Sequence, residues 1–123
     1  MVLINGLLDY ASPWTLPDIY LFTGNDTIKK NGAIVMGRGA AKQVRDTYPG
    51  IDEDFGGAIK ERPNVNIIWS LMDKGQWLGW FKVKNHWRDD ANILLIQDSA
   101  KQLAMIAESK PDITFHMNYK ILA

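Results

Sequence analysis

Two short segments of the sequence combine residue types that could do chemistry. The first is a glycine-rich turn, Met36-Gly37-Arg38-Gly39, which follows the short apolar run 33–36 and leads into a helical pattern opening with Ala40-Ala41. The first turn of a helix presents unpaired N–H groups and the positive end of the helix dipole. Glycine has no Cβ and lets the backbone approach a ligand, and small alanines keep that approach open. The segment therefore predicts a site for phosphate groups.

The turn differs from the two best-known phosphate-binding motifs. Lys42 occupies the position of the last glycine in Gly-X-Gly-X-X-Gly, and the Gly-Lys-Ser/Thr of a P-loop is absent. A tight connection between a strand and a helix, with no ligand, would use the same residues. From this segment alone the binding and the structural interpretations are equally supported.

The second segment is a strand-like run that ends at Lys84. Lys82 and Lys84 are two positions apart, so on a strand they point to the same face. A second ammonium nearby and partial burial both favour the neutral amine, which is the nucleophilic form of lysine. A solvated outer face of the sheet is the alternative interpretation.

The two histidines do not form a metal site by their spacing, and the sequence contains no Cys. We expect His86 to order the loop after Lys84. We expect His116, inside an apolar strand, to be a hydrogen-bonded core residue. Neither a metal nor a cofactor is predicted.

Composition excludes several classes of protein. The chain has 123 residues, of which 46% are hydrophobic and 23% charged, as is usual for a single globular domain. Its 14 basic and 14 acidic residues balance, which argues against a strong non-specific affinity for nucleic acid. No apolar run approaches the ~20 residues of a membrane span, and no signal peptide is recognisable. We expect a cytoplasmic protein.

Alternating strand and helix patterns must position the glycine turn and the lysines. They predict an α/β fold, a three-layer sandwich with a mixed, mostly parallel sheet flanked by helices, in one domain over 1–123. We expect Asp52 to cap the second helix and Asp89 or Asp90 the third, whose apolar stripe starts at Ile93. The expected strands are 2–8, 19–23, 33–36, 65–71, 78–84 and 113–119, and the expected helices are 40–48, 52–62 and 90–108.

The order of motifs resembles a macro domain. Thr23-Gly24-Asn25 precedes the glycine turn, and the helix that follows it ends at Tyr48-Pro49-Gly50. The run from Phe81 to Arg88, with His-Trp-Arg shortly after Lys84, resembles a second signature of the same family. The subgroup with both motifs includes the terminal ADP-ribose glycohydrolases, antitoxins that remove ADP-ribose from DNA, and related phage proteins. The resemblance covers roughly residues 1–119.

The resemblance implies a role for each motif. Asn25 would contact the distal ribose of ADP-ribose, and the glycine turn would hold the diphosphate. Lys84 would be the catalytic lysine, which attacks the anomeric carbon of the distal ribose and forms a covalent sugar adduct. The implied ligand-binding residues are Asn25, Met36, Gly37, Arg38, Gly39, Ala40 and Ala41.

The chain departs from the family pattern in two places. The turn after the first strand reads Asn5-Gly6-Leu7-Leu8, with Asp9 the nearest acid, where the family usually has an adenine-binding Asp. Only Lys120 to Ala123 stand where the family has a second phosphate loop, which supplies a catalytic acid, and further elements. We therefore expect a binder of ADP-ribose or a related nucleotide, with an ADP-ribosyl hydrolase and a degenerate structural protein as alternatives. An uncovered sheet face would make it a homo-oligomer through the last strand or the region of Trp77 and Trp80.

Overall fold

A mixed sheet of five strands forms the centre of the protein. The computed structural model describes residues 2–4, 8–10, 14 and 17–118. The strand order is β1-β5-β2-β4-β3, in which β3 is antiparallel to β4 and all other neighbours are parallel. The strands are β1 (Val2–Ile4), β2 (Asp18–Asn25), β3 (Ile67–Leu71), β4 (Trp77–Lys84) and β5 (Thr114–Asn118).

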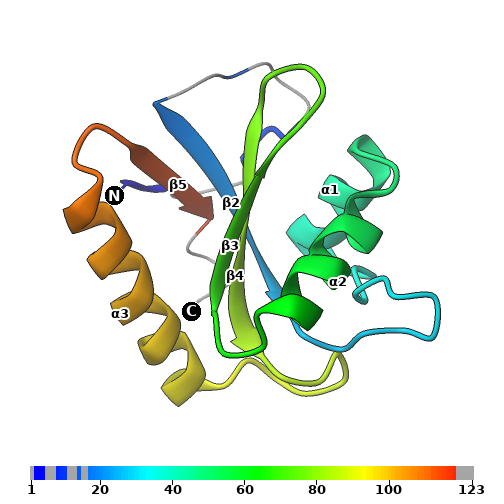
Figure 1. Ribbon diagram of the computed structural model, residues 1–123. Coiled ribbons are helices and arrows are strands. Elements are labelled where there is room, and N and C mark those ends of the chain that lie inside the picture. Colours follow the sequence, from blue (N-terminus) through cyan, green and yellow to red (C-terminus); the bar gives the residue numbers. More distant parts are fainter. Residues whose placement is uncertain (1, 5–7, 11–13, 15–16, 119–123) are drawn as a thin grey trace.

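Helices cover both faces of this sheet (Figure 1). α1 (Gly39–Thr47) and α2 (Ile51–Glu61) lie on one face, and α3 (Ile93–Ser109) lies on the other. Alternation along β2 explains the two cores, because Phe22 packs with α1 and α2 while Ile19 and Leu21 pack with α3. The predicted three-layer α/β sandwich with a mostly parallel sheet is confirmed.

The predicted strand over 33–36 is wrong. In that segment only an isolated bridge pairs Ile34 with Ile28. The backbone instead bonds to the first turn of α2 and to a loop, since the N–H of Ile34 donates to Asp52 O at 3.0 Å and that of Val35 to Thr27 O at 3.1 Å. Ile34 is held by its buried side chain, which packs into the core beneath α1 and α2. An apolar run can thus be a core anchor without joining a sheet.

Two predicted helix caps are also wrong. Gly50, in the left-handed conformation with φ of 92°, precedes α2, and Asp52 already lies within that helix. Asn92 caps α3, where its Oδ1 accepts hydrogen bonds from the N–H groups of Leu94 and Leu95. The N–H of Asn92 donates to Val83 O at 2.8 Å, so the chain is fixed to β4 there and the helix starts after it, beyond Asp89 and Asp90.

The apolar face of α3 also begins later than expected. Ile93 is 62% exposed, whereas Ile96, Ala100, Leu103 and Ala107 pack against the sheet as the periodicity predicted. No helix within the described residues is long and apolar enough to cross a membrane.

Two of the features predicted for self-association, the last strand and Trp80, lie inside the fold, whereas Trp77 is half-buried. β5 lies between β1 and β2 and is hydrogen-bonded on both sides, so it is not an edge strand. Trp80 is fully buried, and its indole Nε1 donates to Asn25 O. The sequence pattern shows neither fact, because both depend on which strand pairs with which.

Candidate functional site

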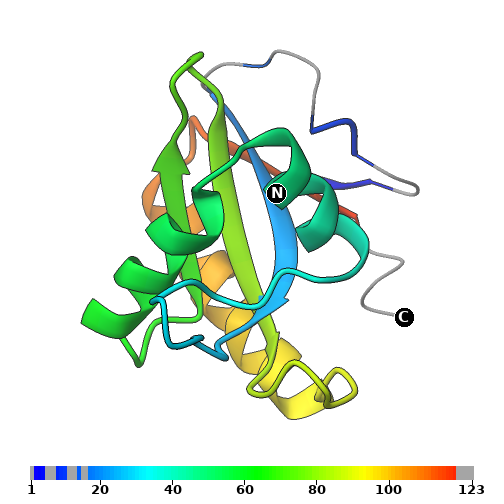
Figure 2. The same cartoon turned by 90° about the vertical axis from the view of Figure 1, so that its right-hand side faces the viewer.

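A cavity of about 350 Å³ opens at the carboxyl ends of β2 and β4. Figures 1 and 2 show the segment between β2 and α1 and the loop after β4 at this same end of the sheet. The cavity brings together three sequence motifs, namely Asn25, the glycine turn and Lys84. It is lined by Thr23, Gly24, Asn25, Val35, Gly37, Arg38, Gly39, Ala40, Ala41, Val83, Lys84, Trp87 and Ala91.

The amino end of α1 faces this cavity. Gly39 begins the helix with φ of 57°, a conformation that favours glycine, and Arg38 before it is extended. No side chain within the described residues caps the helix, and its first turn contains no acidic residue. Ala40 and Ala41 are buried yet line the cavity, which keeps the helix end accessible. The first N–H groups of α1 are therefore free to bind an anion.

Met36 is not among the residues that line the cavity, and its contact with a ligand stays a prediction. Its side chain is 1% exposed and lies in the core beneath α1 and α2. Gly37, the next residue, lines the cavity and has open space where a Cβ would stand. Met36 therefore fixes the start of the turn, and the residues after it face the cavity.

Asn25 lines the cavity but uses its side chain within the fold. Nδ2 donates to Val35 O at 3.0 Å, and Oδ1 accepts from the N–H of Thr27 at 2.9 Å. The residue is 6% exposed. Asn25 thus ties the end of β2 to the segment before the glycine turn, and its contact with a ribose stays a prediction.

The two lysines of β4 have different surroundings. Lys84 lines the cavity, where its Nζ donates to Trp87 O at 3.0 Å and forms no ion pair within the described residues. Lys82 is buried, and its Nζ lies 2.7 Å from Asp26 Oδ2. The expected pair of like charges is therefore wrong, since Asp26 compensates the charge of Lys82. That pairing joins residues 56 positions apart (82 − 26) and has no local signal.

Thr27 is a residue of this site that sequence reasoning missed. Its Oγ1 accepts a hydrogen bond from the N–H of Trp87 at 3.0 Å and donates to Asn85 O at 3.3 Å. Its backbone bonds to Asn25 Oδ1 and to the N–H of Val35. Thr27 therefore connects the loop that carries Lys84 and Trp87 to the wall formed by Asn25 and Val35.

Aromatic and basic side chains follow Lys84. Trp87 is 37% exposed, the guanidinium of Arg88 lies 4.8 Å from its ring centre, and the His86 ring stacks beside it at 5.8 Å. His86 Nδ1 accepts from the N–H of Arg88, so the prediction that His86 orders this loop is confirmed. His116 is only partly buried and bonds to Asp18 Oδ1 at 2.9 Å. No cluster of metal-ligating side chains occurs among the described residues.

The cavity is basic. Arg38 and Lys84 are the charged residues among those that line it, and none of the described lining residues carries a carboxylate. The free N–H groups of α1 add a partial positive charge. The arrangement therefore suits a ligand with negative charge near the glycine turn.

Comparison with known proteins identifies the fold. No protein-family model matches the sequence, and no curated protein matches it. Among solved structures, the macrodomain of Thermus aquaticus DarG aligns with a TM-score of 0.66 at 20% identity over 94% of this chain and 73% of its own. The macrodomain of Mycobacterium tuberculosis DarG aligns with a TM-score of 0.57 at 17% identity, covering 95% of this chain and 97% of its own.

A third structure was solved with a ligand. Thermosipho africanus DarTG in complex with ADP-ribose aligns with a TM-score of 0.65 at 17% identity over 80% of this chain. The match spans 28% of the DarTG chain, so it concerns one part of a larger protein. Because two of these matches are macrodomains aligned over 94% and 95% of this chain, the chain has the macrodomain fold.

Proposed function

We propose that this protein binds ADP-ribose, or a related nucleoside diphosphate, in the cavity between β2, the glycine turn and Lys84. The diphosphate lies against the N–H groups from Gly37 to Ala41, and the distal ribose lies near Asn25 and Lys84. Two observations support this ligand: the macrodomain fold, which DarTG has in complex with ADP-ribose, and a cavity of about 350 Å³ within the range of small-molecule sites.

One observation carries the proposal. The uncapped amino end of α1 shares the cavity with Arg38 and Lys84, and no described lining residue is acidic. Backbone N–H groups at a helix terminus and nearby cations are the usual partners of a phosphate. Arg38 and Lys84 form no ion pair within the described residues, so both cations can contact a phosphate bound at this helix end.

Calorimetric titration with ADP-ribose, ADP and AMP tests the proposal. Gly37→Val adds a branched side chain in the cavity without a strained backbone, because Gly37 has no positive φ and a Cβ there meets nothing within 4 Å. The same substitution at exposed Gly57 of α2, where a Cβ also meets nothing, is the matched control. We expect at least tenfold weaker binding for Gly37→Val alone. Absence of binding of all three nucleotides, or equal affinity of Gly37→Val and wild type, would contradict the proposal.

Hydrolysis of ADP-ribosyl groups is the second candidate, favoured by the position of Lys84. Its Nζ bonds only to a carbonyl oxygen among the described residues, so a substrate can replace that bond. In this reaction the neutral amine attacks the anomeric carbon of the distal ribose. The bond to the macromolecule breaks, and the leaving group takes a proton. Water then releases ADP-ribose from the lysine.

The binding function is preferred because the step that protonates the leaving group lacks a donor. No carboxylate lines the cavity within the described residues. Borohydride trapping with an ADP-ribosylated macromolecule tests the alternative: covalent labelling of the wild type that Lys84→Ala abolishes would establish the hydrolase. Turnover without any labelling would remove Lys84 from the mechanism.

We also propose that the ADP-ribose is carried by a macromolecule. Self-association of the protein is a separate proposal. A homo-oligomer would need a surface other than β5 or Trp80. Light scattering with and without ADP-ribose measures it directly. A degenerate protein that keeps the fold alone would bind no nucleotide and would be indifferent to both Gly37→Val and Lys84→Ala.

A further inference from the structure

Lys82 is a buried charged residue that the proposed binding function leaves unused. It lies on β4 and is 7% exposed, and its Nζ is 2.7 Å from Asp26 Oδ2. Burial of an ammonium is costly unless a partner compensates its charge, and Asp26 is that partner. Apolar residues can fill such a space without this cost, so the ion pair is weak evidence for stability. Its effect on geometry is stronger, because β4 and the end of β2 must be placed so that the two side chains meet.

A register shift separates Lys82 from Lys84. Between Gly24 and Asn25 the pairing of β2 with β4 shifts by one residue. Lys82 lies opposite the first of these residues and Lys84 opposite the second. Consecutive residues of β2 point to opposite faces of the sheet, and each β4 residue points with the one it pairs with. Lys82 is therefore turned toward Asp26 and Lys84 toward the cavity, as bulges beside binding sites re-aim a side chain.

The backbone of Lys82 is fixed on both sides. Its N–H donates to Asn66 O at 3.0 Å, and its carbonyl oxygen accepts from Ser99 Oγ of α3 at 2.6 Å. Trp80, two residues earlier on β4, is fully buried and donates from Nε1 to Asn25 O at 3.2 Å. Lys82 and Trp80 thus form a firmly held anchor for the end of β2.

The anchored segment 25–27 carries both walls of the cavity proposed for the ligand, which we call the nucleotide cavity. On one side the N–H of Val35 donates to Thr27 O at 3.1 Å, just before the glycine turn. On the other side the N–H of Trp87 donates to Thr27 Oγ1 at 3.0 Å. Within the segment, the N–H of Thr27 donates to Asn25 Oδ1 at 2.9 Å. Because Asp26 lies between these two residues, the position of its carboxylate affects both walls.

We propose that Lys82 is a positioning residue of the nucleotide cavity. Its ion pair with Asp26 holds segment 25–27, and this segment holds the loop of Lys84 and Trp87 against the glycine turn. ADP-ribose contacts both walls, whereas ADP lacks the distal ribose placed near Lys84 and needs only the glycine turn. Lys82 therefore favours ADP-ribose over ADP. This selectivity rests on the proposed function, whereas the effect on segment 25–27 does not.

Amide hydrogen exchange of the ligand-free protein tests the effect on the segment. Lys82→Met removes the cation and keeps a long apolar side chain, and the partly exposed Asp26 can then be hydrated. We expect the amides of Thr27, Val35 and Trp87 to exchange at least tenfold faster, beyond any change in the slowest amides of β2 and β4, which report global unfolding. Lys82→Arg keeps the ion pair and should restore their rates. Equal acceleration of all these amides, or of none, would overturn the proposal.

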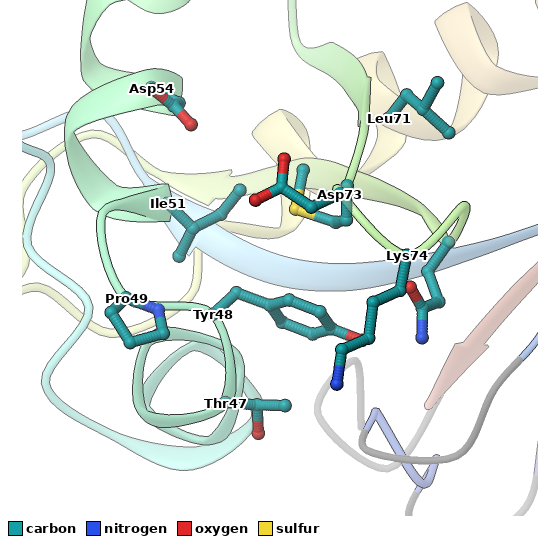
Figure 3. A pocket seen from close by; sticks show the side chains of 10 residues that line it. Thr47, Tyr48, Pro49, Ile51, Asp54, Leu71, Asp73 and Lys74 are labelled. Atoms are coloured by element: carbon teal, nitrogen blue, oxygen red, sulfur yellow. The ribbon is translucent and has the colours of Figure 1, made fainter.

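Lys74→Met is the matched control. Lys74 lies in the turn between β3 and β4, beside a second cavity of about 300 Å³ at the other end of β4 (Figure 3). It forms no ion pair within the described residues, and the two cavities share no lining residue. The control therefore removes the same charge away from segment 25–27, and it should keep wild-type exchange rates and affinities.

Calorimetry with ADP-ribose and ADP tests the selectivity. We expect Lys82→Met to bind ADP-ribose at least tenfold more weakly than the wild type, and ADP less than threefold more weakly. Asp26→Asn added to Lys82→Met leaves neither charge of the pair, so this double variant should fold and show the same two affinities. Equal losses for the two nucleotides would contradict the selectivity. If the wild type binds neither nucleotide, the proposed function fails, and the exchange rates still decide whether Lys82 positions the segment.

Discussion

Thr27→Val removes the hydroxyl that connects the two walls of the nucleotide cavity while keeping the shape of the side chain. Two hydrogen bonds are lost, one from the N–H of Trp87 at 3.0 Å and one to Asn85 O at 3.3 Å. A hydrogen bond contributes about 0.5–1.5 kcal/mol net, and these two are solvent-exposed, so about 1 kcal/mol in total is the reasonable figure. The backbone bonds of Thr27 are unaffected.

The same loss should weaken ligand binding. If the loop of Lys84 and Trp87 must be held against Asn25 to complete the cavity, then ~1 kcal/mol corresponds to about fivefold in the dissociation constant. Calorimetry with ADP-ribose measures the affinity, and thermal unfolding should show a midpoint lowered by about 4 °C. Thr27→Ser keeps the hydroxyl and should restore most of both values. Unchanged affinity in Thr27→Val, or an equal loss in Thr27→Ser, would refute the connection between the walls.

Three further predictions concern stability. Gly56→Ala should destabilise the fold by about 1–3 kcal/mol in denaturant unfolding, because its Cβ would clash with the backbone oxygen of Gly32, whereas Gly57→Ala, with nothing within 4 Å, should stabilise α2 by about 0.5–1 kcal/mol; equal effects would contradict the packing. Asn92→Ala should cost about 1 kcal/mol in the same assay through loss of the α3 cap, and Asp89→Ala should cost little. Burial raises the pKa of the Tyr10 phenol well above its usual range. As pH rises, this phenol therefore loses its proton in the unfolded chain before it does so in the folded protein, and stability should fall above about pH 10. Tyr10→Phe should flatten that fall in urea melts across pH 8–11, and an unchanged slope would show that other groups cause it.

The sequence predicts the parts of the fold that depend on local pattern. The continuous apolar runs of β2 and β4, and the periodic stripe of α3 from Ile96 onward, are where the residues indicate them. The run 33–36 misleads because a buried anchor and a strand have the same composition over four residues. The cap of α3 misleads because Asp89, Asp90 and Asn92 are all good cap residues, and the choice depends on the hydrogen bond from Asn92 to Val83 O.

The candidate site likewise has features that the local sequence pattern indicates and others that it does not. The glycine turn, Asn25 and Lys84 are recognisable in the sequence, and the structure places all three around one cavity. The ion pair of Lys82 with Asp26 and the bonds of Thr27 to Asn85 and Trp87 are not recognisable, because each joins residues more than 50 positions apart. The sequence therefore indicates the polar and glycine residues of the cavity, but neither how its walls are held nor the further lining residues such as Val83, Trp87 and Ala91.

The structural use of Asn25 decides which experiments can separate binding from folding. Because both polar atoms of its amide hold the loop from Thr27 to Val35, Asn25→Ala would disturb the cavity whether or not Asn25 contacts a ribose. The Cβ of Gly37→Val enters open space, and Lys84→Ala removes a side chain whose one hydrogen bond within the described residues goes to Trp87 O. If both of these variants keep the unfolding midpoint and lose ADP-ribose, the loss belongs to the ligand contact. If only Asn25→Ala loses affinity, the cavity wall rather than the phosphate site determines binding.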